Sequence, residues 1–285
     1  MAACREGTRV YALLGHPVEH SFSPQMQNAA FRAAGQDAAY VALDIPPDRL
    51  EASLRGLHAA GVAGLNLTAP HKEAAWPFLS GATADAEESR AVNTLRRDAE
   101  GWFGHATDGL GFRDWIATLA IPVEGARILL IGAGGATRSI APILAALGPA
   151  SIRIVSRNGG RARDVADALR ARAPAPAGVG AAALDESRRA GSRARFSLLI
   201  RALATESIEA AEGEWWARLD PGAQVLDLNY GPRAAASRSR ATAEGRRFED
   251  GLGLLLHQGA HSYEFWTGLP APLEAMRSAL TRGVG

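Results

Sequence analysis

Cysteine is almost absent from this chain of 285 residues, since Cys4 is the only one. A single cysteine excludes an internal disulfide and a cysteine-based metal cluster. The sequence also lacks any apolar run near the ~20 residues that span a bilayer, and its N-terminus lacks a signal-peptide core. We therefore expect a soluble, cytoplasmic protein with no membrane partner.

Neither sign of charge is in excess, with 31 Lys and Arg against 30 Asp and Glu. The arginines are scattered or lie in predicted loops, which argues against nucleic acid as a partner. No internal repeat is present, and the one biased segment, Ala171–Gly178, is predicted to be a surface loop. The length suits two domains with ample hydrophobic core.

The most informative stretch is a strand, a glycine loop and a helix in succession. Ile128–Ile131 is an unbroken apolar run, as a strand buried on both faces requires. Three glycines follow within Gly132–Gly135, and an apolar segment at helical spacing ends at Gly148. Such glycines let backbone amides at a helix N-terminus approach a phosphate closely. The third glycine of the dinucleotide fingerprint is replaced by Thr137, so flavin and adenosylmethionine remain alternatives to a nicotinamide dinucleotide.

The next predicted strand indicates which dinucleotide is bound. Ile152–Val155 ends in Ser156-Arg157-Asn158, about twenty residues beyond the glycines, where this fold places the group that meets the adenosine ribose. An NAD site uses a carboxylate there, and none is present. Arg157 can instead pair with a 2′-phosphate through charge-assisted hydrogen bonds, which predicts NADP as the cofactor. The alternative is a solvated arginine at the end of a strand.

The residues before the glycine loop alternate between strand and helix patterns. Strands are predicted at Val10–Leu14, Tyr40–Leu43 and Val62–Leu67. The first helix is predicted to begin at Ser23-Pro24, with Ser23 as N-cap and Pro24 at the first helical position, and the second to span about residues 48–60. This order predicts a small α/β layer in front of the Rossmann-like unit.

Other elements are predicted from turn and cap signals. Val92–Leu95 and Gly101–Gly104 form the two arms of a predicted hairpin, and a helix follows from Thr107 to about Leu119. Phe196–Ile200 and Val225–Tyr230 are expected to be further parallel strands. Two helices, at residues 251–266 and 272–280, end the chain and could pack back onto the first domain.

Four polar clusters lie at predicted strand ends and loop starts, where open α/β sheets hold ligands. They are Ser21/Ser23, Asn66/Thr68/Lys72, Asn93/Thr94 and Thr107/Asp108. Each has an ordinary structural explanation, such as a helix cap, a turn former or a solvated lysine. Together they would form a lysine–carboxylate pair inside a ring of donors and acceptors, which suits a polyhydroxylated small acid.

A metal site is not expected from this sequence. His257 and His261 stand one helical turn apart, the spacing of a metal-binding pair. No third ligand occurs at a suitable spacing, so the pair does not make a zinc site.

Seven motifs in order now carry a resemblance that covers essentially the whole chain. The sequence resembles the shikimate dehydrogenase family. The matching segments are Gly15-x-Pro17 with His20-Ser21-x-Ser23-Pro24, Asn66-x-Thr68-x-Pro70-x-Lys72, Ala91–Thr94, Thr107-Asp108-Gly109-x-Gly111-Phe112, Gly132–Ala136, Asp227-x-x-Tyr230, and Gly251-Leu252-Gly253 with Gln258 and Phe265–Gly268.

The resemblance implies an α/β fold with an N-terminal substrate domain, an inserted Rossmann-like NADP domain and a cleft between them. The substrate domain would span residues 1–118, completed by 252–285 from helices packing back on it, and the NADP domain residues 119–251. By resemblance, Lys72 and Asp108 form the catalytic pair. The implied substrate ligands are Ser21 and Ser23 for the carboxylate and Asn66, Thr68, Asn93, Tyr230 and Gln258 around the ring. The implied cofactor-binding residues are Gly132, Ala133, Gly134, Gly135, Ala136, Ser156, Arg157, Asn158, Leu228, Gly251 and Leu254.

Several residues depart from the family pattern, mostly on the cofactor side. Arg201-Ala202-Leu203 replaces the usual Asn-Ala-Thr of the loop that walls the cofactor, and Leu254 replaces a usual methionine. Elsewhere, Ala106 replaces Asn, Arg90 replaces Gly and Gln27 replaces His. These changes leave the fold prediction intact and put cofactor affinity and turnover in question.

The function predicted from the sequence is the reversible, NADP-dependent oxidation of shikimate to 3-dehydroshikimate in aromatic amino acid and chorismate biosynthesis. A lysine ammonium is a good proton donor to developing oxyanion charge, and an adjacent carboxylate holds it in place. Two alternatives stay open: a dehydrogenase of quinate or another cyclic polyol acid, and a weakly catalytic paralogue that binds dinucleotide or substrate. The protein is expected to be a monomer or a homodimer.

Overall fold

The computed structural model describes residues 6–172, 178–187, 194–203, 205–208 and 210–283. Cys4 and most of the predicted surface loop at Ala171–Gly178 lie outside these residues. The chain divides into two compact units, one made of Met1–Asp114 with Leu254–Gly285 and the other of Trp115–Gly253. Helices α5 (Thr107–Leu119) and α10 (Leu252–Thr267) each contribute residues to both units.

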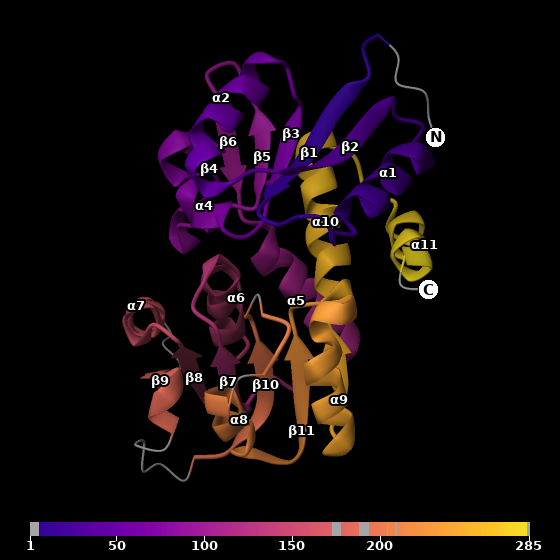
Figure 1. Cartoon of the computed structure of the whole chain (residues 1–285). Coiled ribbons are helices and arrows are strands. Elements are labelled where there is room, and N and C mark those ends of the chain that lie inside the picture. Colours follow the sequence, from indigo (N-terminus) through magenta and orange to yellow (C-terminus); the bar gives the residue numbers. More distant parts are fainter. Residues whose placement is uncertain (1–5, 173–177, 188–193, 204, 209, 284–285) are drawn as a thin grey trace. The chain divides into compact units, whose positions relative to one another are not determined.

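The first unit is a mixed sheet with helices (Figure 1). Its strands follow the order β2-β1-β3-β5-β6-β4. Their bounds are β1 (Arg9–Gly15), β2 (Ala38–Asp44), β3 (Gly64–Leu67), β4 (Leu79–Ala82), β5 (Thr94–Arg97) and β6 (Trp102–His105). The helices, apart from α5 and α10, are α1 (Ser23–Ala33), α2 (Leu50–Ala59), α3 (His71–Ala74), α4 (Ala84–Ser89) and α11 (Leu273–Gly283), with short 3₁₀ turns at Pro47–Arg49 and Trp76–Phe78.

Strand pairing in this unit brings the predicted polar residues together. β1 pairs in parallel with β2 and β3, and β5 runs antiparallel to β3. β5 also runs antiparallel to β6, as the hairpin signal predicted. The register places Asn66 opposite Thr94, and Thr94 opposite His105. Polar side chains from the middle of the sequence therefore meet at one end of adjacent strands.

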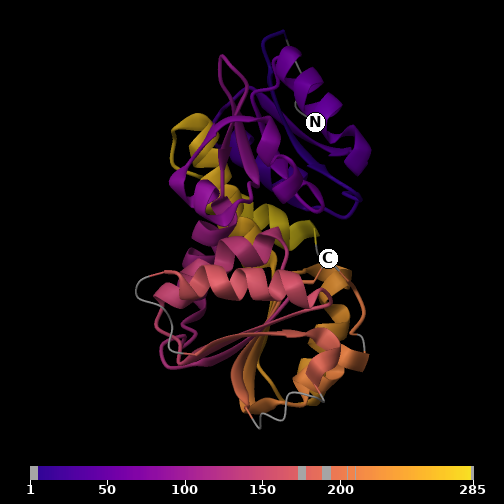
Figure 2. The ribbon, with the colours of Figure 1, turned by 90° about the vertical axis from the view of Figure 1, so that its left-hand side faces the viewer.

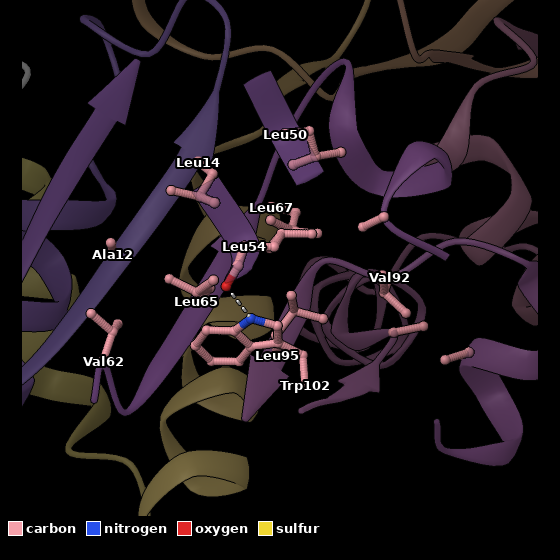
Figure 3. Packing of buried hydrophobic residues seen from close by; sticks show 13 residues of the cluster. Ala12, Leu14, Leu50, Leu54, Val62, Leu65, Leu67, Val92, Leu95 and Trp102 are labelled. Atoms are coloured by element: carbon pink, nitrogen blue, oxygen red, sulfur yellow. Dashed lines mark hydrogen bonds between the residues drawn. The ribbon is translucent and has the colours of Figure 1, made fainter. Parts of the chain in front are cut away.

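A hydrophobic cluster supports this sheet (Figure 3). Leu14, Leu65 and Leu95 come from three neighbouring strands and are completely buried. The indole of Trp102 packs among them, and its Nε1–H donates to the Leu54 carbonyl at 2.9 Å. This bond satisfies the one polar atom of a large buried side chain and fixes α2 against the sheet.

The second unit is a six-stranded parallel sheet of the doubly wound type, with the strand order β12-β11-β10-β7-β8-β9. The strands are β7 (Arg127–Ile131), β8 (Ser151–Ser156), β9 (Val179–Ala183), β10 (Phe196–Arg201), β11 (Leu219–Asp227) and β12 (Phe248–Asp250). The helices confined to it are α6 (Gly135–Ala146), α7 (Gly159–Arg170), α8 (Ala210–Trp216) and α9 (Ala235–Ala243), with 3₁₀ turns at Leu184–Ser187 and Gly231–Ala234. Figure 2 shows α6 and α7 side by side. The α/β fold with a Rossmann-like unit is thus confirmed.

Several predicted boundaries were wrong. The N-cap of α1 is Phe22 and not Ser23, which is the first helical residue. The hydroxyl of Ser21 accepts a hydrogen bond from the Ser23 amide at 3.2 Å, so Ser21 supplies the polar partner that a cap would give. The last predicted strand ends at Asp227, which leaves Tyr230 in the turn that follows. Within the described residues, no helix combines the length and apolar character needed to cross a bilayer.

Candidate active site

Lys72 and Asp108 form an ion pair in the first unit. Lys72 lies in α3, directly after β3, and Asp108 is the second residue of α5. The Lys72 Nζ donates to Asp108 Oδ2 at 2.6 Å, and the two side chains are 19% and 7% exposed. The amino end of α5 favours the carboxylate, because unpaired helix N–H groups carry partial positive charge. A partly buried ammonium is therefore held in one place while part of it stays accessible.

Asn93 and Gln258 extend the pair into a network. The Asn93 amide nitrogen lies 2.9 Å from Asp108 Oδ1 and 3.1 Å from Gln258 Oε1, and its oxygen accepts from the Thr107 amide at 2.7 Å. Gln258 also donates through Nε2 to the Leu255 carbonyl. Asp108 is thus bonded on both oxygens, which leaves Lys72 as the member of the pair with free donor capacity.

Behind this network lies a second, fully buried polar layer. The amide nitrogen of Asn66 lies within 3.0 Å of the Asn93 carbonyl, Thr94 Oγ1 and Ser262 Oγ. Its oxygen accepts from the Tyr40 hydroxyl at 2.8 Å. These contacts use both polar atoms of the Asn66 amide. Asn66 therefore supports Asn93 from behind, and its contact with a substrate stays a prediction.

Sequence reasoning missed Ser262 and Tyr40 as members of this layer. Ser262 lies in α10, is completely buried, and its Oγ is 2.8 Å from Thr94 Oγ1 and 3.2 Å from Thr107 Oγ1. Its hydroxyl donates to the Gln258 carbonyl four residues earlier. The spacing of four from Gln258, on the same helix face, was the available signal.

The predicted carboxylate ligands lie at the start of α1. Ser23 is 5% exposed and Ser21 is half-buried. Thr68 follows β3, and its methyl group packs so closely on Gly15 that a Cβ there would stand 2.3 Å from it. Gly15 therefore lets the loop after β1 approach Thr68. Tyr230 belongs to the other unit, in the turn after β11.

The glycine loop has the geometry of a phosphate cradle. Gly132 has a φ of +120°, and a Cβ on it would lie 2.5 Å from the Ala202 carbonyl oxygen. Gly134 is the N-cap of α6, and a Cβ on it would meet no protein atom within 4 Å. Thr137, in place of the third glycine, is buried and donates to the Gly132 carbonyl at 3.1 Å. The open side of Gly134 and the helix amides behind it fit a pyrophosphate.

The end of β8 also fits the predicted cofactor. Ser156 closes the strand, and Arg157 follows with an exposed side chain. Asn158 is the N-cap of α7, where its Oδ1 accepts from the Arg161 amide at 3.2 Å. Arg161 thus stands in the first turn of the same helix, four residues after Arg157 in the sequence, and sequence reasoning did not select it. No carboxylate occupies Ser156–Asn158, so a 2′-phosphate would meet cationic and neutral groups there.

The remaining predicted cofactor residues lie in different units, two of them in the second unit and one in the first. Leu228 and Gly251 touch after β11 and β12, since a Cβ on Gly251 would lie 2.1 Å from the Leu228 carbonyl oxygen. Leu254 is 8% exposed and belongs to the first unit.

Three departures from the family pattern have structural explanations within the first unit. The Gln27 amide donates to the Gly259 carbonyl at 2.9 Å and so joins α1 to α10. Arg90 ends α4 in the left-handed region at a φ of 52°, and its guanidinium lies 4.9 Å from the Trp76 ring centre. Ala106 packs in the hydrophobic cluster of the sheet.

One histidine of the α10 pair is hydrogen-bonded to a carboxylate. His261 Nε2 lies 2.7 Å from Asp114 Oδ2, which joins α10 to α5. Burial lowers the pKa of His257, and His261 and Arg277 lower it further. Within the described residues, no group of three potential metal ligands is found.

Comparison with known proteins gives concordant results. The family description "Shikimate dehydrogenase substrate binding domain" matches residues 13–95, and "Shikimate 5'-dehydrogenase C-terminal domain" matches residues 251–281. The chain is 38% identical to the shikimate dehydrogenase (NADP(+)) of Moorella thermoacetica, over 100% of this chain and 97% of that protein. It is 40% identical to that of Anaeromyxobacter dehalogenans, over 96% of each.

A solved structure resembles the whole chain as well. It is the shikimate 5-dehydrogenase of Thermus thermophilus in complex with NADP(H) and shikimate, with a TM-score of 0.80 and 30% identity. The similarity covers 96% of this chain and 99% of that one.

Proposed function

The chain belongs to the shikimate dehydrogenase family, and we propose from this that it catalyses the reversible, NADP-dependent oxidation of shikimate to 3-dehydroshikimate. The observation that carries the proposal is the Lys72–Asp108 pair, 2.6 Å apart and held by Asn93. A secondary alcohol loses a hydride and a proton when it is oxidised, so the site needs a proton-transfer group beside the reacting oxygen. When bound, NADP supplies the hydride acceptor, or the donor in the reverse direction.

The proposed role of Lys72 is to exchange a proton with the reacting oxygen and to stabilise negative charge on it. Three N–H donors allow the ammonium to keep its bond to Asp108 while it donates to a ligand. The role of Asp108 is to orient the ammonium, because its other oxygen already accepts from Asn93. An ammonium fixed before the substrate arrives needs little reorganisation during the reaction.

Ser21 and Ser23 are proposed to bind the substrate carboxylate, and Thr68, Asn93, Tyr230 and Gln258 its hydroxyl groups. The positive end of α1 favours an anion beside the two serines. Asn66 was predicted from the sequence to contact the substrate. We propose that Asn66 also supports Asn93, because its amide nitrogen donates to the Asn93 carbonyl.

The cofactor ligands are proposed to be the backbone of Gly132–Ala136 for the pyrophosphate and Arg157 for the 2′-phosphate. Gly134 fits this role because a Cβ on it would meet no protein atom, so a ligand can approach its backbone. Ser156, Asn158, Leu228, Gly251 and Leu254 remain further predicted contacts. The predicted cytoplasmic location and the monomeric or dimeric state stay predictions, which fractionation and sedimentation test.

The decisive experiment assays purified protein with shikimate against NADP and NAD by nicotinamide absorbance. We expect turnover with shikimate and a preference for NADP. Lys72 is the only lysine of the chain, so labelling with ¹³C-lysine gives one side-chain signal that reports binding without turnover. A shift of that signal with shikimate, but no turnover, would support the weakly catalytic alternative instead.

A further inference from the structure

Arg201 is a completely buried arginine at the carboxyl end of β10. Its side chain, like those of Glu212 and Asp227, has an exposure of 0%. The guanidinium Nε donates to Glu212 Oε1 at 2.8 Å, and Nη1 lies 3.3 Å from Asp227 Oδ2. All three residues belong to the second unit, in β10, α8 and β11. A buried charge of this kind is rare unless it is paired and fully hydrogen-bonded.

The remaining donors of the guanidinium point into the segment that follows β10. Nη1 donates to the Thr205 carbonyl at 2.9 Å, while Nη2 donates to Thr205 Oγ1 at 2.9 Å and to the Ser207 carbonyl at 3.0 Å. A guanidinium has five N–H donors in a fixed planar fork, and here each has an acceptor. The positions of Thr205 and Ser207 therefore match the shape of this fork. A lysine, with three donors on one atom, cannot match it.

The two carboxylates hold the guanidinium in position. Asp227 Oδ2 also accepts from Ser237 Oγ at 2.6 Å, and its Oδ1 accepts from the Asn229 amide at 2.9 Å. Glu212 Oε1 accepts from the Trp216 indole at 3.2 Å. Asn229 in turn donates to the Leu203 carbonyl at 2.6 Å, which fixes the same segment from a second side.

Ala202 and Leu203, directly after the carboxyl end of β10, lie where a doubly wound sheet binds dinucleotides. In the strand order β11-β10-β7-β8, the chain leaves β7 toward one edge and returns at β10 toward the other. Ligands of such sheets bind at the carboxyl ends of the strands on either side of this reversal. The Ala202 amide donates to the Ile131 carbonyl at 2.7 Å, and Gly132 is in contact with the Ala202 carbonyl. The segment thus adjoins the glycine loop directly.

Stability alone does not account for the cluster. Buried ion pairs are often no more stabilising than well-packed apolar side chains, because desolvation cancels much of their attraction. Two carboxylates around one guanidinium also leave an excess negative charge, and burial raises the pKa of Asp227. The arrangement is better explained if the cluster serves to fix the position of the segment after β10.

We propose that Arg201 is a positioning residue for dinucleotide binding, whose guanidinium holds the described residues after β10, 202–203 and 205–208, as one wall of the site next to the glycine loop. Glu212 and Asp227 anchor the guanidinium. The inference rests on the proposed function only in taking NADP as the ligand. Arg201 departs from the family pattern, and from the sequence this departure suggested a weaker cofactor site. In the structure, Arg201 is instead the residue that holds this wall in place.

The test compares Arg201→Lys with the wild type and with Arg127→Met. Arg127 is a control in the same sheet, since it begins β7 at the amino end and pairs with Asp220 at the surface. Loss of the guanidinium contacts should weaken NADP binding by calorimetry about 10-fold or more, the effect of losing ~1.4 kcal/mol of hydrogen bonding. The control should bind NADP as the wild type does.

Steady-state kinetics separate positioning from folding. A positioning role raises the KM for NADP and leaves kcat at saturating NADP within a few-fold, whereas partial unfolding lowers kcat at unchanged KM. An NADP dissociation constant within two-fold of the wild type, or a loss confined to kcat, would overturn the proposal. If Arg201→Lys does not fold, Glu212→Gln carries the same test, because it keeps the acceptor oxygen and removes one anchoring charge. The calorimetric comparison of NADP binding needs no turnover, so failure of the proposed activity would leave that comparison intact.

Discussion

The ammonium of Lys72 and the carboxylate of Asp108 depend on each other in two ways, one chemical and one structural. Lys72→Ala should reduce turnover at least ~100-fold, the lower range for a positioned acid–base group, with NADP affinity within a few-fold of the wild type. It should also destabilise the protein, because Asp108, a buried carboxylate, would be left without its cation. Initial rates and urea unfolding measure the two effects.

The double variant Lys72→Ala/Asp108→Ala separates these effects. Removing both charges should recover stability relative to the single variant without recovering turnover. Near-normal turnover in Lys72→Ala would remove this residue from the proposed mechanism.

Arg157 is the residue on which the choice between NADP and NAD depends. Arg157→Ala should weaken NADP binding by roughly 1.5–3 kcal/mol and leave NAD almost unchanged, because only NADP carries the 2′-phosphate. Calorimetry with both dinucleotides measures this. Arg170→Ala, at the far end of α7 and paired with Asp167, is the matched control and should change neither affinity. Equal losses for NADP and NAD in Arg157→Ala would show that this residue does not recognise the phosphate.

At the scale of elements, the backbones of α5 and α10 come into close contact at a glycine. A Cβ on Gly111 would lie 2.4 Å from the Gln258 backbone nitrogen, and backbone atoms cannot rotate away. Gly111→Ala should therefore push α10 from α5, cost about 1–3 kcal/mol of stability and displace Gln258 from Asn93. Thermal unfolding and the KM for shikimate report the two consequences.

Gly56→Ala is the control for this change. Gly56 lies within α2, and a Cβ on it would meet nothing within 4 Å. The same substitution should there stabilise the protein by about 0.5–1 kcal/mol, through higher helix propensity. A Gly111→Ala variant as stable and active as the wild type would show that the two helices can separate without cost.

A helix or strand could be predicted from the sequence where the pattern that specifies it lies within the element itself. The strand, glycine loop and helix at residues 127–146 were predicted because burial on both faces leaves an unbroken apolar run and the loop needs glycine. Strand β4 and helix α4 were not predicted. β4 is a four-residue, partly exposed edge strand, and its Leu-Ser-Gly-Ala sequence has no clear alternation.

The candidate site was also harder to predict where its contacts join residues that are far apart in the sequence. The clusters at strand ends suggested a lysine–carboxylate pair, but only the resemblance to a family assigned Lys72 and Asp108 as the catalytic pair, since residues 36 positions apart carry no local sign of contact. Ser262 and the partners of Arg201 were missed for that reason: Glu212 and Asp227 lie 11 and 26 residues away, in separate elements. Only the packed strands bring these side chains together.

On the scale of the whole molecule, buried histidines make stability depend on pH. His71 is fully buried, its Nε2–H donates to the Ile45 carbonyl, and its Nδ1 has no hydrogen-bond partner among the described residues. Burial lowers the pKa of His71 and also that of His105. The folded state thus prefers neutral imidazoles, while the unfolded chain binds protons below a pH of about 6.5.

Stability should therefore be complete above pH 6.5 and fall as the pH decreases below it, by up to about 1.4 kcal/mol per pH unit for each proton. Urea unfolding between pH 7.5 and 5 measures the slope. His71→Gln keeps an N–H donor toward Ile45 and should reduce the slope in that range. An identical slope in the variant would mean that other groups take up the protons.

The substrate preference of the whole protein follows from the two serines at the start of α1. Shikimate carries its carboxylate on a flat, unsaturated carbon, whereas quinate has a tetrahedral carbon with an added hydroxyl. Ser23 is 5% exposed, and the Ser21 hydroxyl already accepts from the Ser23 amide, so little polar capacity is left for another group. A buried hydroxyl without a partner costs about 1–3 kcal/mol.

We therefore expect shikimate to exceed quinate at least ~10-fold in kcat/KM, equivalent to ~1.4 kcal/mol. Competition between the two acids measures the ratio, and Ser21→Ala should raise the KM for shikimate. Equal efficiencies, or a preference for quinate, would show that the serine pair does not select the flat acid.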